Sequence, residues 1–382
     1  MTFRLPDELE EFRVSVRRFA EKEIAPLATA TDEQGEFPIK SFEAYRDSGF
    51  VRSIYPEEHG GDGGGALTYA LLVEEVARVC GSSSLFMLIS RLGMTPVMLH
   101  GSEELRRRYL PRVASGESQA SYCLSESGAG SDVAAMQTRA VRDGDHYLLS
   151  GRKAWITNAG VSDVYTVFAK TDPGAGHRGI SAFVVESDLP GVSIGKIEQK
   201  MGMRGSPTGE LVLDDVVVDA ANLIGEEGRA FGYALGALDR SRPIVGAQAV
   251  GLAQGALEVA ARYVVERRQF DRRIADFQGI QFMLADMATK VDAARLLVYR
   301  ACAVVDDGLP GVSRMSAMAK LFAADTAMEV TTDAVQLLGG AGYTRDFPVE
   351  RMMRDAKATQ IYEGTNQVQR VVIARRLLDE LA

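Results

Sequence analysis

The spacing of the apolar residues changes twice along the chain, and this limits the possible folds more than any other feature. Up to about residue 120 the apolar residues recur every three or four positions, as in amphipathic helices. From about 121 to 225 they alternate as in half-buried strands, and helical spacing then returns. The sequence therefore predicts a multidomain α+β protein: an all-α domain over 1–120, a middle antiparallel β-domain over 121–228 and a C-terminal four-helix bundle over 229–382.

The two helical regions differ in how their apolar residues are distributed. Near the N-terminus Phe12, Val16 and Phe19 lie on one stripe, which is typical of a helix with one buried side. The segment 82–99 is apolar on nearly every side, so we expect a helix in the interior. In the C-terminal region, successive stripes predict long antiparallel helices. Pro243 falls inside the first of them and marks either its true start or a kink.

The middle region carries a turn signal between two of its alternating runs. Asp143 and Gly144 separate the run at 140–142 from the run at 146–149. An Asp-Gly pair adopts the positive φ angles that a two-residue hairpin turn requires. We therefore expect these two runs to pair as a β-hairpin.

Composition excludes several classes of function. The net charge of -9 opposes nucleic-acid binding, which needs a basic face. Three widely spaced cysteines and four scattered histidines give no metal-ligand pattern, so we expect no metal site and reduced thiols, as in a cytoplasmic protein. The N-terminus lacks the apolar run of a signal peptide, and no uninterrupted apolar stretch has the length of a membrane span.

The segment 361–367 contains a lone acid, Glu363, among apolar, small and amide-bearing residues. Gly364 allows a close approach of the backbone, while the residues after it offer hydroxyl and amide groups. This composition suits a carboxylate base beside a polar ligand. A solvated surface turn explains the same residues equally well, so this segment alone leaves the choice open.

Four further segments allow both a structural and a binding role. The loop 125–132 contains glycines that either join two domains or let the backbone approach a flat ligand. Trp155, the only tryptophan, is either a core residue of the β-domain or the wall of a ligand site. Arg267 and the segment 336–340 fit helix C-termini, where cations and glycine are favourable. They also offer a guanidinium and amide groups to a bound anion.

Taken together, the order of the three regions and these motifs resemble the acyl-CoA dehydrogenases over almost the whole chain. The resemblance implies an FAD-dependent α,β-dehydrogenation of an acyl-CoA to the trans-2-enoyl-CoA, a step of fatty-acid β-oxidation. It also implies electron transfer to an electron-transferring flavoprotein and a homotetramer. The motifs are Tyr-Cys-Leu-Ser-Glu at 122–126, Gly-Ala-Gly-Ser-Asp at 128–132, Trp-Ile-Thr-Asn at 155–158, Arg-Arg-Gln-Phe at 267–270 with Gln278, Gln-Leu-Leu-Gly-Gly at 336–340, and the Glu363 turn.

The resemblance implies a role for each site residue. Glu363 is the base that removes the α-proton, because Ser241 stands where other branches of the family carry the catalytic glutamate. Asp239 is a minor rival as the base. Arg267 and the 336–340 segment are expected to complete the cofactor site of a neighbouring subunit. FAD contacts are implied for Tyr122, Leu124, Ser125, Ser131, Trp155, Thr157, Arg267, Gln269, Phe270, Gln278, Gln336, Gly339, Gly340, Thr365 and Gln367, and substrate contacts for Ser131, Asp239, Arg242, Gly364 and Arg375.

The acyl group and the acceptor are less constrained by the sequence. Bulky residues in the apolar segment 82–99 favour a short or branched acyl chain, because any that point into the pocket shorten it. Three alternatives share the fold: a flavin oxidase, an acyl-carrier-protein-linked dehydrogenase and a non-catalytic scaffold. The joint presence of Glu363, Ser125, Thr157 and Arg267 argues against the scaffold.

Overall fold

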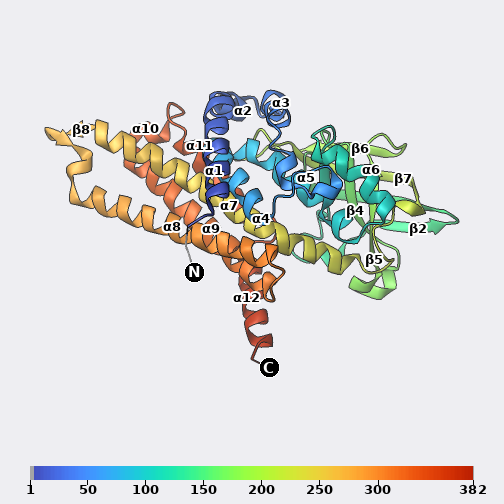
Figure 1. The fold of residues 1–382 in the computed structure, drawn as a ribbon. Coiled ribbons are helices and arrows are strands. Elements are labelled where there is room, and N and C mark those ends of the chain that lie inside the picture. Colours follow the sequence, from blue (N-terminus) through green and yellow to red (C-terminus); the bar gives the residue numbers. More distant parts are fainter. Residues whose placement is uncertain (1–3, 382) are drawn as a thin grey trace.

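The computed structural model describes residues 4–381 and contains the three regions in the predicted order (Figure 1). The β-sheet lies at one end of the molecule, and the longest helices extend from it to the opposite end (Figure 1). The N-terminal region is helical, as predicted. Its helices are α1 (Asp7–Phe19), α2 (Ala28–Gln34), α3 (Ile39–Ser48), α4 (Ala66–Ala77), α5 (Gly81–His100) and α6 (Glu103–Ala114).

The middle region forms one seven-stranded sheet, of order β1-β4-β2-β3-β7-β6 with β5 paired to β4. Most pairs are antiparallel, including the predicted hairpin of β2 with β3. The exceptions are β1, which runs parallel to β4, and a single parallel pair between β2 and β4. The prediction of an antiparallel domain thus missed a crossover. The strands are β1 (Ala120–Cys123), β2 (Arg139–Asp143), β3 (His146–Thr157), β4 (Val164–Lys170), β5 (Ile180–Glu186), β6 (Val192–Ile197) and β7 (Thr208–Asp219).

The C-terminal region contains the predicted long helices and two short ones that the sequence did not indicate. The first long helix runs through Pro243 without a break, so a start at this proline is wrong. The short helix α11 leads directly into the Glu363 turn. The elements are α7 (Ala230–Glu266), β8 (Arg268–Gln269), β9 (Arg272–Arg273), α8 (Gln278–Asp306), α9 (Val312–Leu338), α10 (Gly340–Tyr343), α11 (Val349–Thr359) and α12 (Asn366–Asp379).

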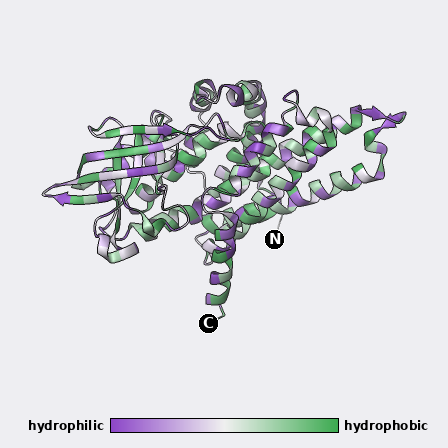
Figure 2. Ribbon diagram, turned by 180° about the vertical axis from the view of Figure 1, so that it is seen from behind, coloured by the Kyte–Doolittle hydropathy of each residue, from purple (hydrophilic) through white to green (hydrophobic). Residues whose placement is uncertain are grey.

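Two helices, α5 and α7, are long and apolar enough to cross a membrane by length and composition alone. In both, most of the apolar window is buried inside the protein, 83% in α5 and 72% in α7, as in core helices. Figure 2 shows the same distribution: hydrophobic residues gather where helices pack together, and the β8–β9 hairpin at the tip is hydrophilic. These two helices therefore supply the interior against which the other regions are packed.

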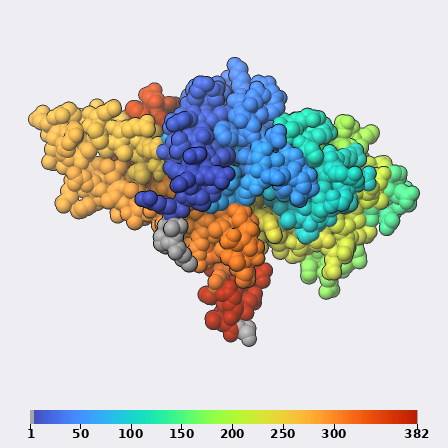
Figure 3. Space-filling model, in the orientation of Figure 1, coloured from blue at the N-terminus to red at the C-terminus, as the bar shows by residue number. Residues whose placement is uncertain are grey.

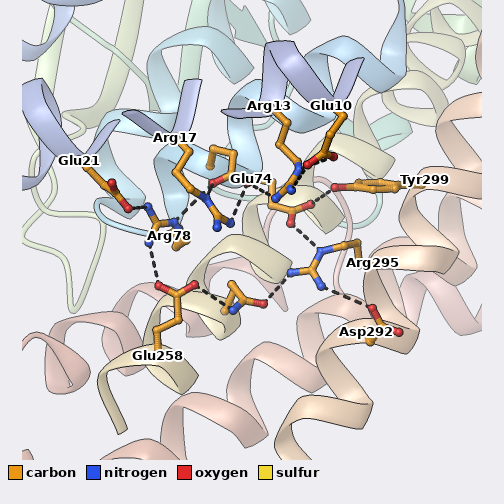
Figure 4. Close-up of polar contacts among 12 residues, drawn as sticks. Glu10, Arg13, Arg17, Glu21, Glu74, Arg78, Glu258, Asp292, Arg295 and Tyr299 are labelled. Atoms are coloured by element: carbon orange, nitrogen blue, oxygen red, sulfur yellow. Dashed lines mark hydrogen bonds and ion pairs between the residues drawn. The ribbon is translucent and has the colours of Figure 1, made fainter. Parts of the chain in front are cut away.

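A network of charged residues joins α1 to α4, α7 and α8 (Figure 4). Glu75 of α4 is almost fully buried and binds Arg13 at 3.2 Å, Arg17 at 2.8 Å and Arg78 at 3.4 Å. Its neighbour Glu74 accepts hydrogen bonds from α8. Figure 3 shows the N-terminal helices seated on the C-terminal ones, with α12 projecting from the body. The network therefore holds the first helix on the bundle.

We expect Glu75→Gln to lower the stability of the protein by about 3 kcal/mol, because it removes the buried carboxylate that Arg13, Arg17 and the buried Arg78 share. Thermal unfolding of the purified protein measures this effect. Glu10→Gln is the matched control, since Glu10 pairs with Arg13 at the surface and should contribute under about 1 kcal/mol. Equal shifts in the two variants would contradict a structural role for the burial of Glu75.

Candidate active site

The Glu363 turn connects α11 to α12 and has an unusual backbone. Glu363 has φ 53° and Gly364 has φ 92°, both in the left-handed region. For a residue other than glycine this costs about 1–3 kcal/mol and persists only when the surroundings enforce it. A side chain at Gly364 would also lie 2.7 Å from the Gln369 amide. Thr365 then caps α12 by accepting a hydrogen bond from the Val368 N–H at 3.3 Å.

The carboxylate of Glu363 is only partly satisfied. The Ser241 hydroxyl of α7 donates a hydrogen bond to Oε2. Oε1 is shielded from solvent and has no hydrogen-bond partner among residues 4–381. Burial raises the pKa of Glu363 to about 7, and the nearby Ser241, Arg242 and Lys320 oppose this increase. Such a carboxylate can accept a proton near neutral pH.

The three regions of the chain meet around this carboxylate. The hydroxyl of Tyr362 donates to Gln248 of α7, and the Gln248 amide donates to Ser84 of α5 at 2.7 Å. From the sheet, the Tyr122 hydroxyl donates to the Ala234 carbonyl of α7 at 3.1 Å. Burial and the charge of Glu363 raise the pKa of Tyr122 well above its usual value, so this strand also lies near the site.

Asp239, the rival base, is already engaged. Its carboxylate accepts a hydrogen bond from Arg242 at 2.6 Å, within the same helix. The Arg242 Nε also donates to the backbone carbonyl of Glu363 at 3.3 Å. Asp239 therefore neutralises and orients the arginine beside the turn.

The predicted flavin-contacting residues of the sheet lie on β1, on β3 and in the loop after β1, and they differ in exposure: Leu124 is buried, whereas Ser131 and Trp155 are exposed. Trp155 is 59% exposed, so its interpretation as a β-domain core residue is wrong. Its backbone has φ 61°, and Ile156 behind it is buried while Thr157 is only partly covered. An added side-chain atom at Gly128 or Gly130 would meet no other atom within 4 Å. An exposed aromatic ring beside an open glycine loop fits the face of a flat ring system.

The loop between β1 and β2 is fixed by a buried ion pair that the sequence analysis missed. Lys153 of β3 donates to Glu126 at 2.9 Å and to the Leu124 carbonyl at 3.3 Å. Glu126 also accepts hydrogen bonds from the Thr138 backbone and hydroxyl. The pair holds both ends of the loop that contains Ser125 and Ser131. Ser125 is partly covered and Ser131 is exposed.

A second group of predicted cofactor residues lies at the opposite end of the molecule. Arg267 ends α7, and Gln269, Phe270 and Gln278 belong to or follow the β8–β9 hairpin, far from the sheet (Figure 1). Gln336 and Gly339 form the C-terminal cap of α9, with Gly339 at φ 59° and Gly340 opening α10. The helix-cap interpretation of this segment is therefore correct. In one chain these residues do not approach the Glu363 turn.

Two of the predicted contacts on the last helix are exposed to solvent. Arg375 and Gln367 are exposed on α12, which projects from the body (Figure 1). In contrast, Arg242, Gly364 and Thr365 lie in or against the turn. The structure thus brings together only part of the set that the sequence assigned to substrate and cofactor.

Three polar residues of the site were not assigned a role by the sequence. Ser241 was noted only as replacing an acid, yet it donates to Glu363. Gln248 is fully buried behind Tyr362, and a lone amide on an apolar helix face was its signal. Lys320 is fully buried in α9 and donates to the Gly364 carbonyl at 2.9 Å. A single lysine within an alanine-rich stripe could have revealed it.

Comparison with known proteins agrees with this geometry. Three domain families match in order: the acyl-CoA dehydrogenase N-terminal domain over residues 6–117, the middle domain over 121–216 and the C-terminal domain over 228–378. The chain therefore belongs to the acyl-CoA dehydrogenase family. It is an oxidoreductase of the flavoprotein class, with the fold predicted from its sequence.

Individual relatives cover nearly the whole chain. It is 54% identical over 376 residues to a probable acyl-CoA dehydrogenase, FadE25, of Mycobacterium tuberculosis, covering 98% of this chain and 97% of the relative. Butyryl-CoA dehydrogenase of Megasphaera elsdenii superposes with a TM-score of 0.96 at 41% identity, covering 99% of this chain and all of that one. A chain from a study of the electron-transferring flavoprotein of Acidaminococcus fermentans superposes with a TM-score of 0.97 at 46% identity, with the same coverage.

Proposed function

We propose that the protein catalyses the FAD-dependent α,β-dehydrogenation of a short or branched acyl-CoA to the trans-2-enoyl-CoA, with Glu363 as the base. The observation that carries this proposal is the Glu363 carboxylate, with one unpaired oxygen and a pKa near 7. A carboxylate with these properties is unionised at low pH and able to accept a proton at neutral pH. The rate of proton removal should therefore rise with pH through about 7 and then level off.

The residues of the chain divide the chemistry between them. Glu363 Oε1 accepts the α-proton, while the hydrogen bond from Ser241 holds the other oxygen in place. Arg242 anchors the backbone of the turn, and its ion pair with Asp239 keeps the guanidinium oriented. The flavin of FAD, when bound, supplies the acceptor for the hydride that leaves the β-carbon. Packing of three regions around the turn limits the access of water to the base.

The FAD site, in this proposal, is shared between subunits. Tyr122, Leu124, Ser125, Ser131, Trp155 and Thr157 of one chain would contact the flavin side, together with Thr365 and Gln367. Arg267, Gln269, Phe270, Gln278, Gln336, Gly339 and Gly340 of a neighbouring chain would contact the phosphate and adenosine side. This division is supported by the distance between the two groups in one chain (Figure 1).

A homotetramer would bring these groups together. Phe270 is 87% exposed at the tip of the hairpin, and Phe282 and Tyr343 are exposed at the same end of the molecule. Exposed aromatic residues gathered beside a predicted binding group mark an interaction surface. We place the protein in the cytoplasm, in agreement with its three free cysteines.

The proposed preference for a short or branched acyl group rests on α5. The predicted bulky residues of this helix are all buried, but Phe86 packs against Phe37, Phe42 and Tyr45 in the N-terminal core. Phe86 is therefore not a pocket residue. Ser84 approaches the turn through Gln248, and Leu88 lies one helical turn further along. Butyryl-CoA dehydrogenase, which carries a short substrate in its name, superposes over nearly the whole chain.

The proposal is tested by anaerobic bleaching of the flavin with straight and branched acyl-CoA substrates. We expect rapid bleaching with four- or five-carbon acyl groups, within the typical range of enzyme turnover of about 1–10³ per second. Equal bleaching by long chains would remove the short-chain preference. Peroxide formed in stoichiometric amounts in air would indicate an oxidase, and electron transfer to an electron-transferring flavoprotein would support the proposed acceptor.

Trp155→Ala should slow reoxidation by the electron acceptor more than it slows reduction by substrate. The reason is that Trp155 is exposed at the edge of the proposed flavin surface. Stopped-flow measurement of the two half-reactions separates these steps, and Val141→Ala, an exposed apolar residue on β2, is a suitable control. A variant impaired only in flavin reduction would count against this placement.

A further inference from the structure

Lys320 is a buried cation at the base of the Glu363 turn. Its side chain is fully buried in α9, and its ammonium donates to the Gly364 carbonyl and to Asn366 Oδ1, both at 2.9 Å. These acceptors stand one and three residues after the proposed base. A buried lysine is costly unless its donors are satisfied and its charge is balanced. The two hydrogen-bond acceptors are neutral, so they satisfy the donors of Lys320 but do not balance its charge.

The turn is held from three directions. Gln369 of α12 donates to the carbonyls of Glu363 and Gly364 at 3.3 and 2.9 Å, and Arg242 of α7 donates to the Glu363 carbonyl. Lys320 provides the anchor from α9. The left-handed conformation of Glu363 needs such enforcement, since the residue is not a glycine. Lys320 is thus one of three donors that fix where the carboxylate points.

The ammonium also acts on the charge of the base. The charged groups acting on Lys320 are Glu363 from the turn, Arg242 from α7 and Asp325 from α9 itself. From α12, Arg370 pairs with Asp325 at 3.0 Å and offsets it. Burial lowers the pKa of Lys320 to about 7, while Glu363 opposes this change. Each group therefore favours the charged form of the other.

We propose that Lys320 is a positioning residue for the dehydrogenation: it anchors the Glu363 turn and favours the ionised form of the Glu363 carboxylate. This inference rests on the proposed function, in which Glu363 is the base. Lys320 touches neither substrate nor cofactor in this assignment. It acts through the carboxylate, and its effect must therefore depend on pH.

The test is single-turnover flavin bleaching by an acyl-CoA across the pH range, in the holoenzyme. In Lys320→Gln a donor remains but the cation is lost, so the pH of half-maximal rate should rise by about one unit or more. For a rise of one unit the variant should be about fivefold slower at about pH 7, and at about pH 9.5 it should approach the wild-type rate. Lys320→Arg keeps the charge and should show a half-maximal pH no higher than the wild type.

Lys357→Met is the matched control, because Lys357 lies exposed on α11 and, within the described residues 4–381, its ammonium donates only to Gln360. A purely structural role would slow Lys320→Gln by the same factor at every pH, which would overturn the proposal. If variants without a charge at this position do not fold, Lys320→Arg provides the test. A folded Lys320→Arg with a raised half-maximal pH also overturns the proposal. Glu363→Gln separates the two ideas. If Glu363→Gln bleaches at the wild-type rate, Glu363 is not the base and the proposed function fails. If Glu363→Gln is inactive but the half-maximal pH of Lys320→Gln is unchanged, only the role of Lys320 is refuted.

Discussion

Glu363→Gln is expected to retain FAD and fold but to lose nearly all dehydrogenation. The amide has almost the same shape and can still accept the hydrogen bond from Ser241, so stability should change little. It cannot take the α-proton. A positioned base contributes about 10²–10⁴-fold in rate, and the loss is larger if the hydride cannot leave without proton removal. Single-turnover bleaching of the flavin by a good acyl-CoA measures this loss.

Asp239→Asn is the informative companion of this variant. Asp239 is bound to Arg242 at 2.6 Å, so its removal should disturb substrate binding more than proton removal. We expect Asp239→Asn to bleach with a higher substrate requirement but an unchanged pH dependence. If Glu363→Gln bleaches within about tenfold of the wild-type rate, Asp239 replaces it as the candidate base.

The order of the three regions could be predicted from the sequence because periodicity reports burial directly. A helix with one buried face and a half-buried strand place apolar residues at different spacings, and both signals are strong here. The parallel pairing of β1 with β4 could not be predicted. Strand partners are set by long-range packing, and the alternation of apolar residues is the same for either direction.

The candidate site divides in the same way. Glu363 and its glycine could be found because an acid in an apolar turn is locally unusual. Ser241 could not, since a serine in a helix gives no local indication of what it faces. Gln248 is a lone amide on an apolar helix face, which marks the residue but not its partner Tyr362. For Trp155 the sequence favoured the wrong structural interpretation. A lone tryptophan usually lies in a core, and only the fold reveals that this one is 59% exposed.

Arg267→Ala is expected to weaken FAD binding by about 10- to 150-fold, which corresponds to the loss of a charge-assisted hydrogen bond worth about 1.5–3 kcal/mol. Arg267 is exposed just after the end of α7, and among residues 4–381 its guanidinium has no ion-pair partner, so it can reach another chain. Reconstitution of the apoprotein with FAD gives the affinity, and sedimentation gives the oligomeric state. The reduction by substrate of fully loaded enzyme should change much less.

Arg262→Ala provides the control for this variant. Arg262 lies about one helical turn earlier on α7, and it makes one exposed ion pair, to Glu258 at 3.8 Å. Removing it deletes the same charge from the same helix without touching the motif at 267–270. Equal losses of FAD affinity in both variants would mean that the change in net charge, and not the loss of a specific Arg267 contact, causes the effect. An obligate monomer that binds FAD with normal affinity would refute the shared site, because in a single chain the β8–β9 hairpin after Arg267 and the β-sheet lie toward opposite ends of the molecule (Figure 1).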